Sequence, residues 1–134
     1  MEPIRIFLDT NVIIDYFTGR LRDDNALNIM RIGELPCYEL NISFLTAVNT
    51  MYVAQKLCPQ LKPSVLTELF NILPQTTRQW EKAQSLEMPD FEDALQISCA
   101  IDSGCDIFIT RDRHFSAAPV KTYSPEEFLN LVLR

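Results

Sequence analysis

The sequence has few of the residues that mark flexible or repetitive chains. Among its 134 residues there are only three glycines, and it has no low-complexity tract and no internal repeat, which argues against a linker or a disordered tail. No apolar run approaches the roughly 20 residues of a membrane span. Residues 1–8 are too short for a signal peptide, because Asp9 interrupts them. We therefore expect one domain over residues 1–134, in the cytoplasm and not at a membrane.

Motifs of several common kinds of site are also absent. The four cysteines form no C-x-x-C pair and have no histidine at ligand spacing, so reduced thiols are favoured over a zinc site or a disulfide framework. Neither a P-loop nor a G-x-S-x-G turn is present. The single histidine, His114, is more typical of a surface or capping residue than of a catalyst.

The charge is moderately acidic, with a formal net charge of −6 and a pI near 4.7. This balance argues against indiscriminate binding to nucleic acid, which needs a basic surface. It does not exclude an enzyme that acts on nucleic acid, because a carboxylate-rich metal site is acidic until its ions bind.

Short apolar runs alternate with segments of helical period. Strands are expected over residues 4–8, 37–42, 72–75, 106–110 and 119–122. Helices are expected over residues 11–17, 25–32, 43–57, 63–70, 76–86, 91–103 and 125–133. Strands separated by helices predict right-handed crossovers and a parallel sheet covered on both faces, so the expected fold is a three-layer α/β/α sandwich. The apolar residues of helices 25–32 and 43–57 could form core or a groove for a partner's helix, and core is favoured.

Two acids follow two of these strands directly. Asp9 ends the first strand and Asp112 lies just past strand 106–110. Ligands of open parallel sheets bind beyond the carboxyl ends of the strands, so both acids belong to one edge of the sheet and lie close if their strands are neighbours. Asp9 could instead only cap the next helix, and Asp112 could be a loop acid without a role.

Two further acids open helix 91–103. Asp90 and Asp93 are three residues apart and therefore share a helix face. Asp90 is a natural N-cap with Asp93 at the third helical position, which is close to a capping box. Capping is the favoured role of Asp90, whereas for Asp93 a role in a site is favoured over capping alone.

Clustered carboxylates repel one another unless a proton or a cation neutralises them. Oxygen ligands suit the hard ions Mg²⁺ and Mn²⁺, which can activate water and neutralise the charge that builds up on a phosphodiester. A phosphatase of the haloacid dehalogenase type would need a second Asp two residues after Asp9, where this sequence has Asn11.

The segments "IFLDTNVIIDYF" and "DFEDALQISCAIDSGCDIFITRDRHF" together resemble the PIN domain, the nuclease fold of Vap-type toxins in bacterial toxin–antitoxin pairs. The resemblance extends over nearly the whole chain. It implies a PIN-like parallel sheet between helices, Mg²⁺ or Mn²⁺ as cofactor, and cleavage of single-stranded RNA by metal-activated water. It also implies a small antitoxin partner and a homodimer.

The resemblance assigns roles to individual residues. The metal acids would be Asp9, Asp93 and Asp112, with Asp90 as an additional acid. Polar side chains that hold these acids or contact phosphate would be Thr10, Asn11, Thr110 and Arg111.

One position departs from the family pattern. The Glu that usually follows the Ser and Thr of a segment such as "ISFLTAVN" is here Asn49, and residues 43–57 contain no acid. An amide oxygen can ligate a hard ion but brings no charge and cannot act as a base. Two hypotheses follow: a metal-dependent ribonuclease toxin, or a catalytically impaired PIN-like module that binds RNA or a protein partner.

Overall fold

A computed structural model describes residues 2–19, 23–112 and 119–133, so His114 lies outside the described residues. The strands are β1 (Ile4–Leu8), β2 (Tyr38–Ser43), β3 (Asn71–Leu73), β4 (Ile107–Ile109) and β5 (Lys121–Tyr123). The helices are α1 (Thr10–Thr18), α2 (Asn25–Ile32), α3 (Phe44–Leu57), α4 (Ser64–Leu69), α5 (Thr77–Ser85), α6 (Phe91–Asp102) and α7 (Pro125–Val132). Every expected element is present, and each boundary lies within two residues of the expected one.

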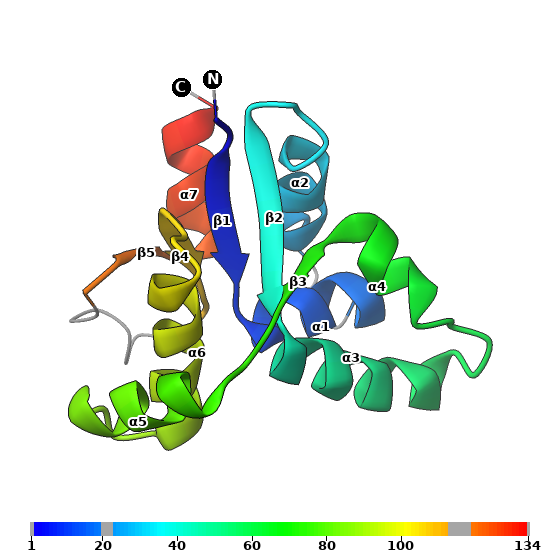
Figure 1. The fold of residues 1–134 in the computed structure, drawn as a ribbon. Coiled ribbons are helices and arrows are strands. Elements are labelled where there is room, and N and C mark those ends of the chain that lie inside the picture. The colour runs from blue at the N-terminus through cyan, green and yellow to red at the C-terminus, as the bar shows by residue number, and fades with distance from the viewer. Residues whose placement is uncertain (1, 20–22, 113–118, 134) are drawn as a thin grey trace.

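The five strands form one parallel sheet in the order β3-β2-β1-β4-β5. The strand order reverses at β1, so the neighbours β1 and β4 flank the switch point where open α/β sheets bind ligands. The register pairs Leu8 with Ile109, so Asp9 and the segment after β4 leave the sheet at the same level. Figure 1 shows β1 and β2 pointing the same way, toward the end of the sheet where α1 and α3 begin.

Helices cover both faces of this sheet, which confirms the three-layer α/β/α prediction. Ile6 and Leu8 of β1 pack into a cluster with residues of α1, α2, α4 and α7. Phe7 points to the other face, where it stacks on Phe108 at a ring distance of 5.0 Å and packs against α6. Alternate residues of β1 therefore belong to different clusters, as expected for a strand that is buried on both sides.

The apolar faces of α2 and α3 differ in their burial. In α2 the apolar residues Ala26, Ile29, Met30 and Ile32 are buried, as the preference for core predicts. In α3, Ala47 is buried and Met51 packs against the core, whereas Phe44, Val48 and Tyr52 are each more than half exposed, so the preference for core is correct for only part of this helix. The residues that α3 buries are Thr46, Ala47, Thr50 and Ala54. The helical period identifies residues that share a face but does not show which face is buried. In α3 the buried face consists of small and polar residues, and the helix packs against α1.

All four cysteines are free thiols, of which Cys99 and Cys105 are buried. Burial raises the pKa of the Cys99 thiol to about 12, so it is an unreactive core residue. Within the described part of the chain, no helix combines the length and the apolar character needed to cross a membrane.

Candidate metal centre

Asp9 lies buried at the junction between β1 and α1. Its Oδ1 accepts hydrogen bonds from the backbone N–H of Thr10 at 2.9 Å and from Gln96 Nε2 at 3.2 Å. Its Oδ2 accepts one from the Thr110 hydroxyl at 2.8 Å. Asp9 therefore caps α1, as one of the two interpretations predicts, and it is also tied to α6 and to the end of β4.

Burial raises the pKa of Asp9, because the desolvation of the carboxylate outweighs the three hydrogen bonds that favour its charge. The negative charge of Asp112 adds to the increase, so the two acids are near enough to interact. This is the proximity that the neighbouring strands β1 and β4 predict.

Asp93 brings a third carboxylate from the first turn of α6. Burial raises its pKa from the ordinary value of 3.8 to about 7, and the charges of Asp90, Asp112 and Asp9 add to the increase. A hydrogen bond between the carboxyl groups of Asp93 and Asp112 contributes as well. Acids from three separate segments thus repel one another at one edge of the sheet.

Asp90 has the capping role expected of it. It is exposed, and its Oδ1 accepts the backbone N–H of Asp93 at 3.2 Å at the start of α6. Its charge also contributes to the raised pKa of Asp93. Asp90 therefore positions the turn that carries Asp93.

The polar residues around the acids hold the loops in place. The Thr110 hydroxyl bridges the two segments, since it donates to Asp9 and accepts the backbone N–H of Asp112 at 3.0 Å. The Thr10 hydroxyl lies 2.7 Å from that of Thr46 on α3, and Asn11 Oδ1 accepts the backbone N–H of Arg111 at 3.4 Å.

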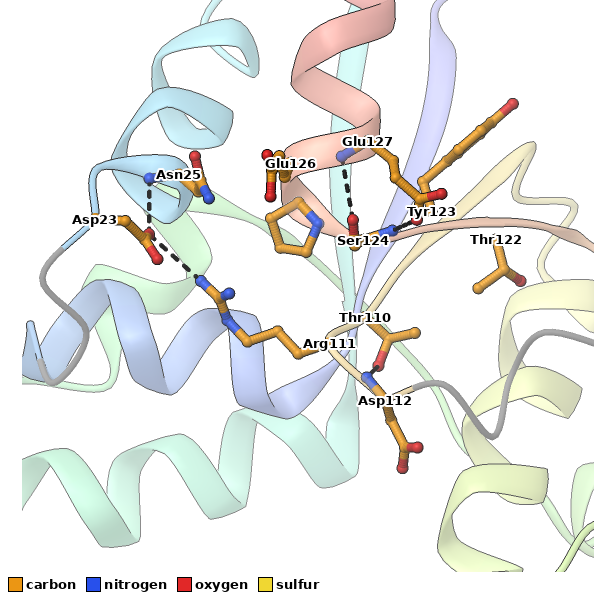
Figure 2. A pocket seen from close by; sticks show the side chains of 11 residues that line it. Asp23, Asn25, Thr110, Arg111, Asp112, Thr122, Tyr123, Ser124, Glu126 and Glu127 are labelled. Carbon is orange, nitrogen blue, oxygen red and sulfur yellow. Dashed lines mark hydrogen bonds and ion pairs between the residues drawn. The ribbon is translucent and has the colours of Figure 1, made fainter.

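Arg111 is directed away from the acids. Its Nε donates to Asp15 of α1, and its Nη2 lies 3.6 Å from Asp23 Oδ1. Figure 2 shows the Arg111 and Asp112 side chains pointing to opposite sides of the loop. Both residues line a pocket of about 770 Å³. In this arrangement the guanidinium binds two carboxylates of its own chain, so the predicted contact with phosphate remains a prediction.

Asn49 is half-buried on α3, one turn after Thr46. The helix α3 carries no Asp or Glu. The acids whose charges raise the pKa of Asp9 or Asp93 lie after β1, at the start of α6 and after β4. The position that departs from the family pattern thus leaves the α3 side of the centre uncharged.

No role in a site was predicted for Ser43, Thr46 and Gln96, which form a buried polar cluster next to Asp9. Gln96 is bonded to Asp9 and Thr46, and Ser43 to Gln96. One signal was available: Gln96 lies three residues after Asp93 and therefore on the same side of α6.

Most of the chain matches the model of one known protein family. The family model described as PIN domain matches residues 5–114, which is most of the chain. The chain belongs to the PIN domain family. The matched region contains Asp9, Asp93 and Asp112 and the whole of α6 and β4.

Individual relatives of this PIN domain cover almost its full length. Ribonuclease VapC1 of Aquifex aeolicus (strain VF5) is 28% identical over 137 residues, which cover 96% of this chain and 95% of the relative. A toxin-antitoxin complex from Klebsiella pneumoniae contains a chain with a TM-score of 0.73 and 24% identity, over 90% of this chain and 97% of that one. VapC20 of Mycobacterium tuberculosis, described as a sarcin-ricin loop cleaving toxin, has a TM-score of 0.64 and 19% identity, over 86% and 95% of the two chains. The solved structures show that the fold is shared.

The donor set of the PIN domain fits a hard divalent cation by its chemistry. In the described residues, no three His, Cys, Asp or Glu side chains are already gathered in an arrangement that would hold a metal ion. Burial is the main cause of the raised pKa values of Asp9 and Asp93, and the charges of neighbouring acids add to it, so a bound cation would offset that repulsion. Asp9, Asp93 and Asp112 would supply the oxygens that Mg²⁺ and Mn²⁺ prefer.

The raised pKa of Asp93 predicts how stability depends on pH without metal. An acid with a pKa of 3.8 in the unfolded chain and about 7 in the folded one holds its proton more tightly when folded. Its contribution to the free energy of unfolding therefore decreases as the pH rises from about 4 to about 7. Asp93→Asn removes this contribution, so the variant should become progressively more stable than the native protein across that range.

Urea unfolding in EDTA at several pH values measures this difference. Glu92→Gln is the matched control, because Glu92 is the exposed neighbour in the same turn and the charge change is the same. A constant difference between Asp93→Asn and the native protein over the whole pH range would contradict the prediction.

Proposed function

We propose that this PIN domain is a metal-dependent endoribonuclease that cleaves single-stranded RNA and acts as the toxin of a toxin–antitoxin pair. The observation that carries the proposal is that Asp9 and Asp93, from two separate segments, both have a pKa raised by burial, and that the charge of Asp112 adds to the increase at each of them. The relative from Aquifex aeolicus named as a ribonuclease supports the same activity.

The three acids would hold Mg²⁺ or Mn²⁺, and the bound ion would polarise water and offset the charge that develops on the phosphodiester. Asp9 is fixed for this task by the Thr10 N–H and the Thr110 hydroxyl, which bind different oxygens of its carboxylate. Asp93, with a pKa of about 7, has to release its proton before it can serve as a ligand, so metal binding should release protons near neutral pH.

The proposal includes partners and a location. Solved relatives are described as a toxin-antitoxin complex from Klebsiella pneumoniae and as VapBC2 from Rickettsia felis bound to promoter DNA, which supports a small antitoxin protein as partner. The exposed apolar residues Phe44, Val48 and Tyr52 of α3 are consistent with association, including a homodimer. The free thiols agree with the reducing cytoplasm.

A second function is favoured by one observation, the uncharged Asn49 on α3. With one carboxylate fewer, the chain could bind RNA or a protein without cleaving. The Asn49→Glu variant separates the two functions, because it restores the acid that the family pattern has at this position.

The test is the cleavage of a mixed single-stranded RNA in Mn²⁺, with and without excess EDTA. We expect the native chain to cut only with Mn²⁺, and Asn49→Glu to reach half its maximal rate at a several-fold lower Mn²⁺ concentration, because an added carboxylate attracts the cation. If the native chain is silent and Asn49→Glu cuts, the chain works by binding. If neither variant cuts, the ribonuclease proposal is wrong.

A further inference from the structure

Gln96 is a buried polar residue that no step above uses. It lies on α6 and is 1% exposed. Its amide contacts four polar side chains at the ends of β1 and β2 and the starts of α1 and α3, namely Asp9, Thr10, Ser43 and Thr46. Burial of an amide is costly unless its donors and acceptors are paired. The arrangement around Gln96 therefore needs a reason beyond packing.

The orientation of the Gln96 amide follows from its partners. An ionised Asp9 can only accept hydrogen bonds, so the nitrogen has to face Asp9 Oδ1, 3.2 Å away. The oxygen then faces Ser43, whose hydroxyl donates to it at 2.5 Å. The two amide hydrogens match the two shorter contacts of Nε2, to Asp9 and to the Thr46 hydroxyl at 2.8 Å, while the Thr10 hydroxyl lies at 3.4 Å.

The partners of Gln96 on α3 are themselves held by hydrogen bonds. Ser43 caps α3 by accepting the Thr46 N–H at 3.0 Å, and its hydroxyl also lies 3.1 Å from that of Thr46. Thr46 in turn meets the Thr10 hydroxyl at 2.7 Å. Since Ser43 and Thr46 are fixed by the first turn of α3, the Gln96 amide has one favourable orientation, with its N–H directed at Asp9.

The position of Gln96 on α6 adds a second effect. Asp93 lies one turn earlier on the same helix, so the bond between Gln96 and Asp9 also sets how α6 sits against the end of β1. Gln96 therefore orients the Asp9 carboxylate directly, and it also helps to position Asp93 by holding α6 in place. Groups that orient metal ligands in this way typically change metal affinity by about 10–100-fold when they are removed.

We propose that Gln96 is a positioning residue of the candidate metal centre: through its hydrogen bonds to Asp9, Thr46 and Ser43 it fixes the Asp9 carboxylate and the α6 backbone so that Asp9 and Asp93 serve one divalent cation. This inference rests on the proposed function. It concerns a residue that neither touches the reacting atoms nor supplies a ligand itself.

The test uses Gln96→Met, which keeps the volume of the side chain and removes all of its hydrogen bonds. Gln79→Met is the matched control, because Gln79 is also 1% exposed and its Nε2 donates to Pro74 O and Asp102 Oδ2, both at 3.2 Å, on the helix pair α5–α6. Three quantities are measured for each variant. Titration calorimetry gives the Mn²⁺ affinity, thermal unfolding in EDTA gives the stability, and RNA cleavage in Mn²⁺ gives kcat and KM.

Gln96→Met should weaken Mn²⁺ binding by about 10–100-fold and lower kcat, with KM for RNA nearly unchanged. Both Met variants should lose a similar amount of thermal stability in EDTA, because each loses buried hydrogen bonds. Gln79→Met, however, should bind Mn²⁺ like the native protein. Should Gln96→Met not fold, Thr46→Val removes the hydroxyl that accepts from Gln96 at 2.8 Å, together with its contacts to Thr10 and Ser43, and should weaken Mn²⁺ binding several-fold.

Equal Mn²⁺ affinity in Gln96→Met and the native protein, or an equal loss of Mn²⁺ affinity in the two Met variants, would overturn the role of Gln96 and leave the ribonuclease proposal intact. A native protein that neither binds Mn²⁺ nor cleaves RNA would instead refute the proposed function, and the inference with it.

Discussion

Asp9→Asn is expected to lower the rate of single-stranded RNA cleavage by about 10²–10³-fold, the usual effect of removing a group that stabilises developing charge. The substitution keeps the shape of the side chain. An Asn oxygen can still accept from the Thr10 N–H and from Gln96, and its NH₂ can donate to the Thr110 hydroxyl. What is lost is the negative charge that would bind the cation.

The same variant should be at least as stable as the native protein in EDTA. Burial raises the pKa of Asp9, which means that the folded chain holds the ionised carboxylate at a cost that a neutral amide does not have. Cleavage assays in Mn²⁺ and thermal unfolding in EDTA test both statements. Glu92→Gln removes the same charge from an exposed position and should leave cleavage unchanged. Undiminished cleavage by Asp9→Asn would show that Asp9 is not part of the centre.

Arg111→Met is expected to cost about 3 kcal/mol in the free energy of unfolding, the lower end of the range for the loss of one partner of a buried ion pair. The side chain of Asp15 is 2% exposed and that of Arg111 is 25% exposed, so the substitution leaves a buried carboxylate without its guanidinium. The thioether of Met keeps much of the volume but offers no charge and no donor.

Urea unfolding of three variants checks this prediction. Arg78→Met is the control, because Arg78 pairs with Asp102 at 3.7 Å while its side chain is 72% exposed, and its loss should cost less than about 1 kcal/mol. Asp15→Asn combined with Arg111→Met should recover part of the loss, since this double variant has no buried charge at the position of the former ion pair. If Arg111→Met and Arg78→Met lose the same small amount, the Arg111 pair does not stabilise the fold.

The meeting of Asp9 and Asp112 could be predicted from the sequence because it needs only two facts. Each acid ends a strand, and parallel strands bring their carboxyl ends to one edge of the sheet. The sequence could not show that β1 and β4 are neighbours, which the pairing of Leu8 with Ile109 supplies. The N-cap role of Asp90 was predictable for a similar reason, since it depends on contacts within one turn.

The partners of Arg111 and Gln96 could not be predicted, because they lie far away in sequence. Arg111 bonds to Asp15 across 96 residues, and Gln96 to Asp9 across 87. Which long polar side chain reaches which acid depends on distances between loops and helices that a periodic pattern does not contain. The exposed residues of α3 illustrate the same limit, since a pattern of spacing identifies a face of the helix and does not reveal what covers it.

The measurement that tests the central claim most directly is a calorimetric titration of Mn²⁺ into the native chain and into Asp9→Asn, Asp93→Asn and Asp112→Asn, with Glu92→Gln as the control. If the three acids form one metal centre, the native chain and the control bind alike, and each of the other variants loses at least about tenfold in affinity. If all five proteins bind Mn²⁺ equally, the cation is held elsewhere and the three acids are not its ligands.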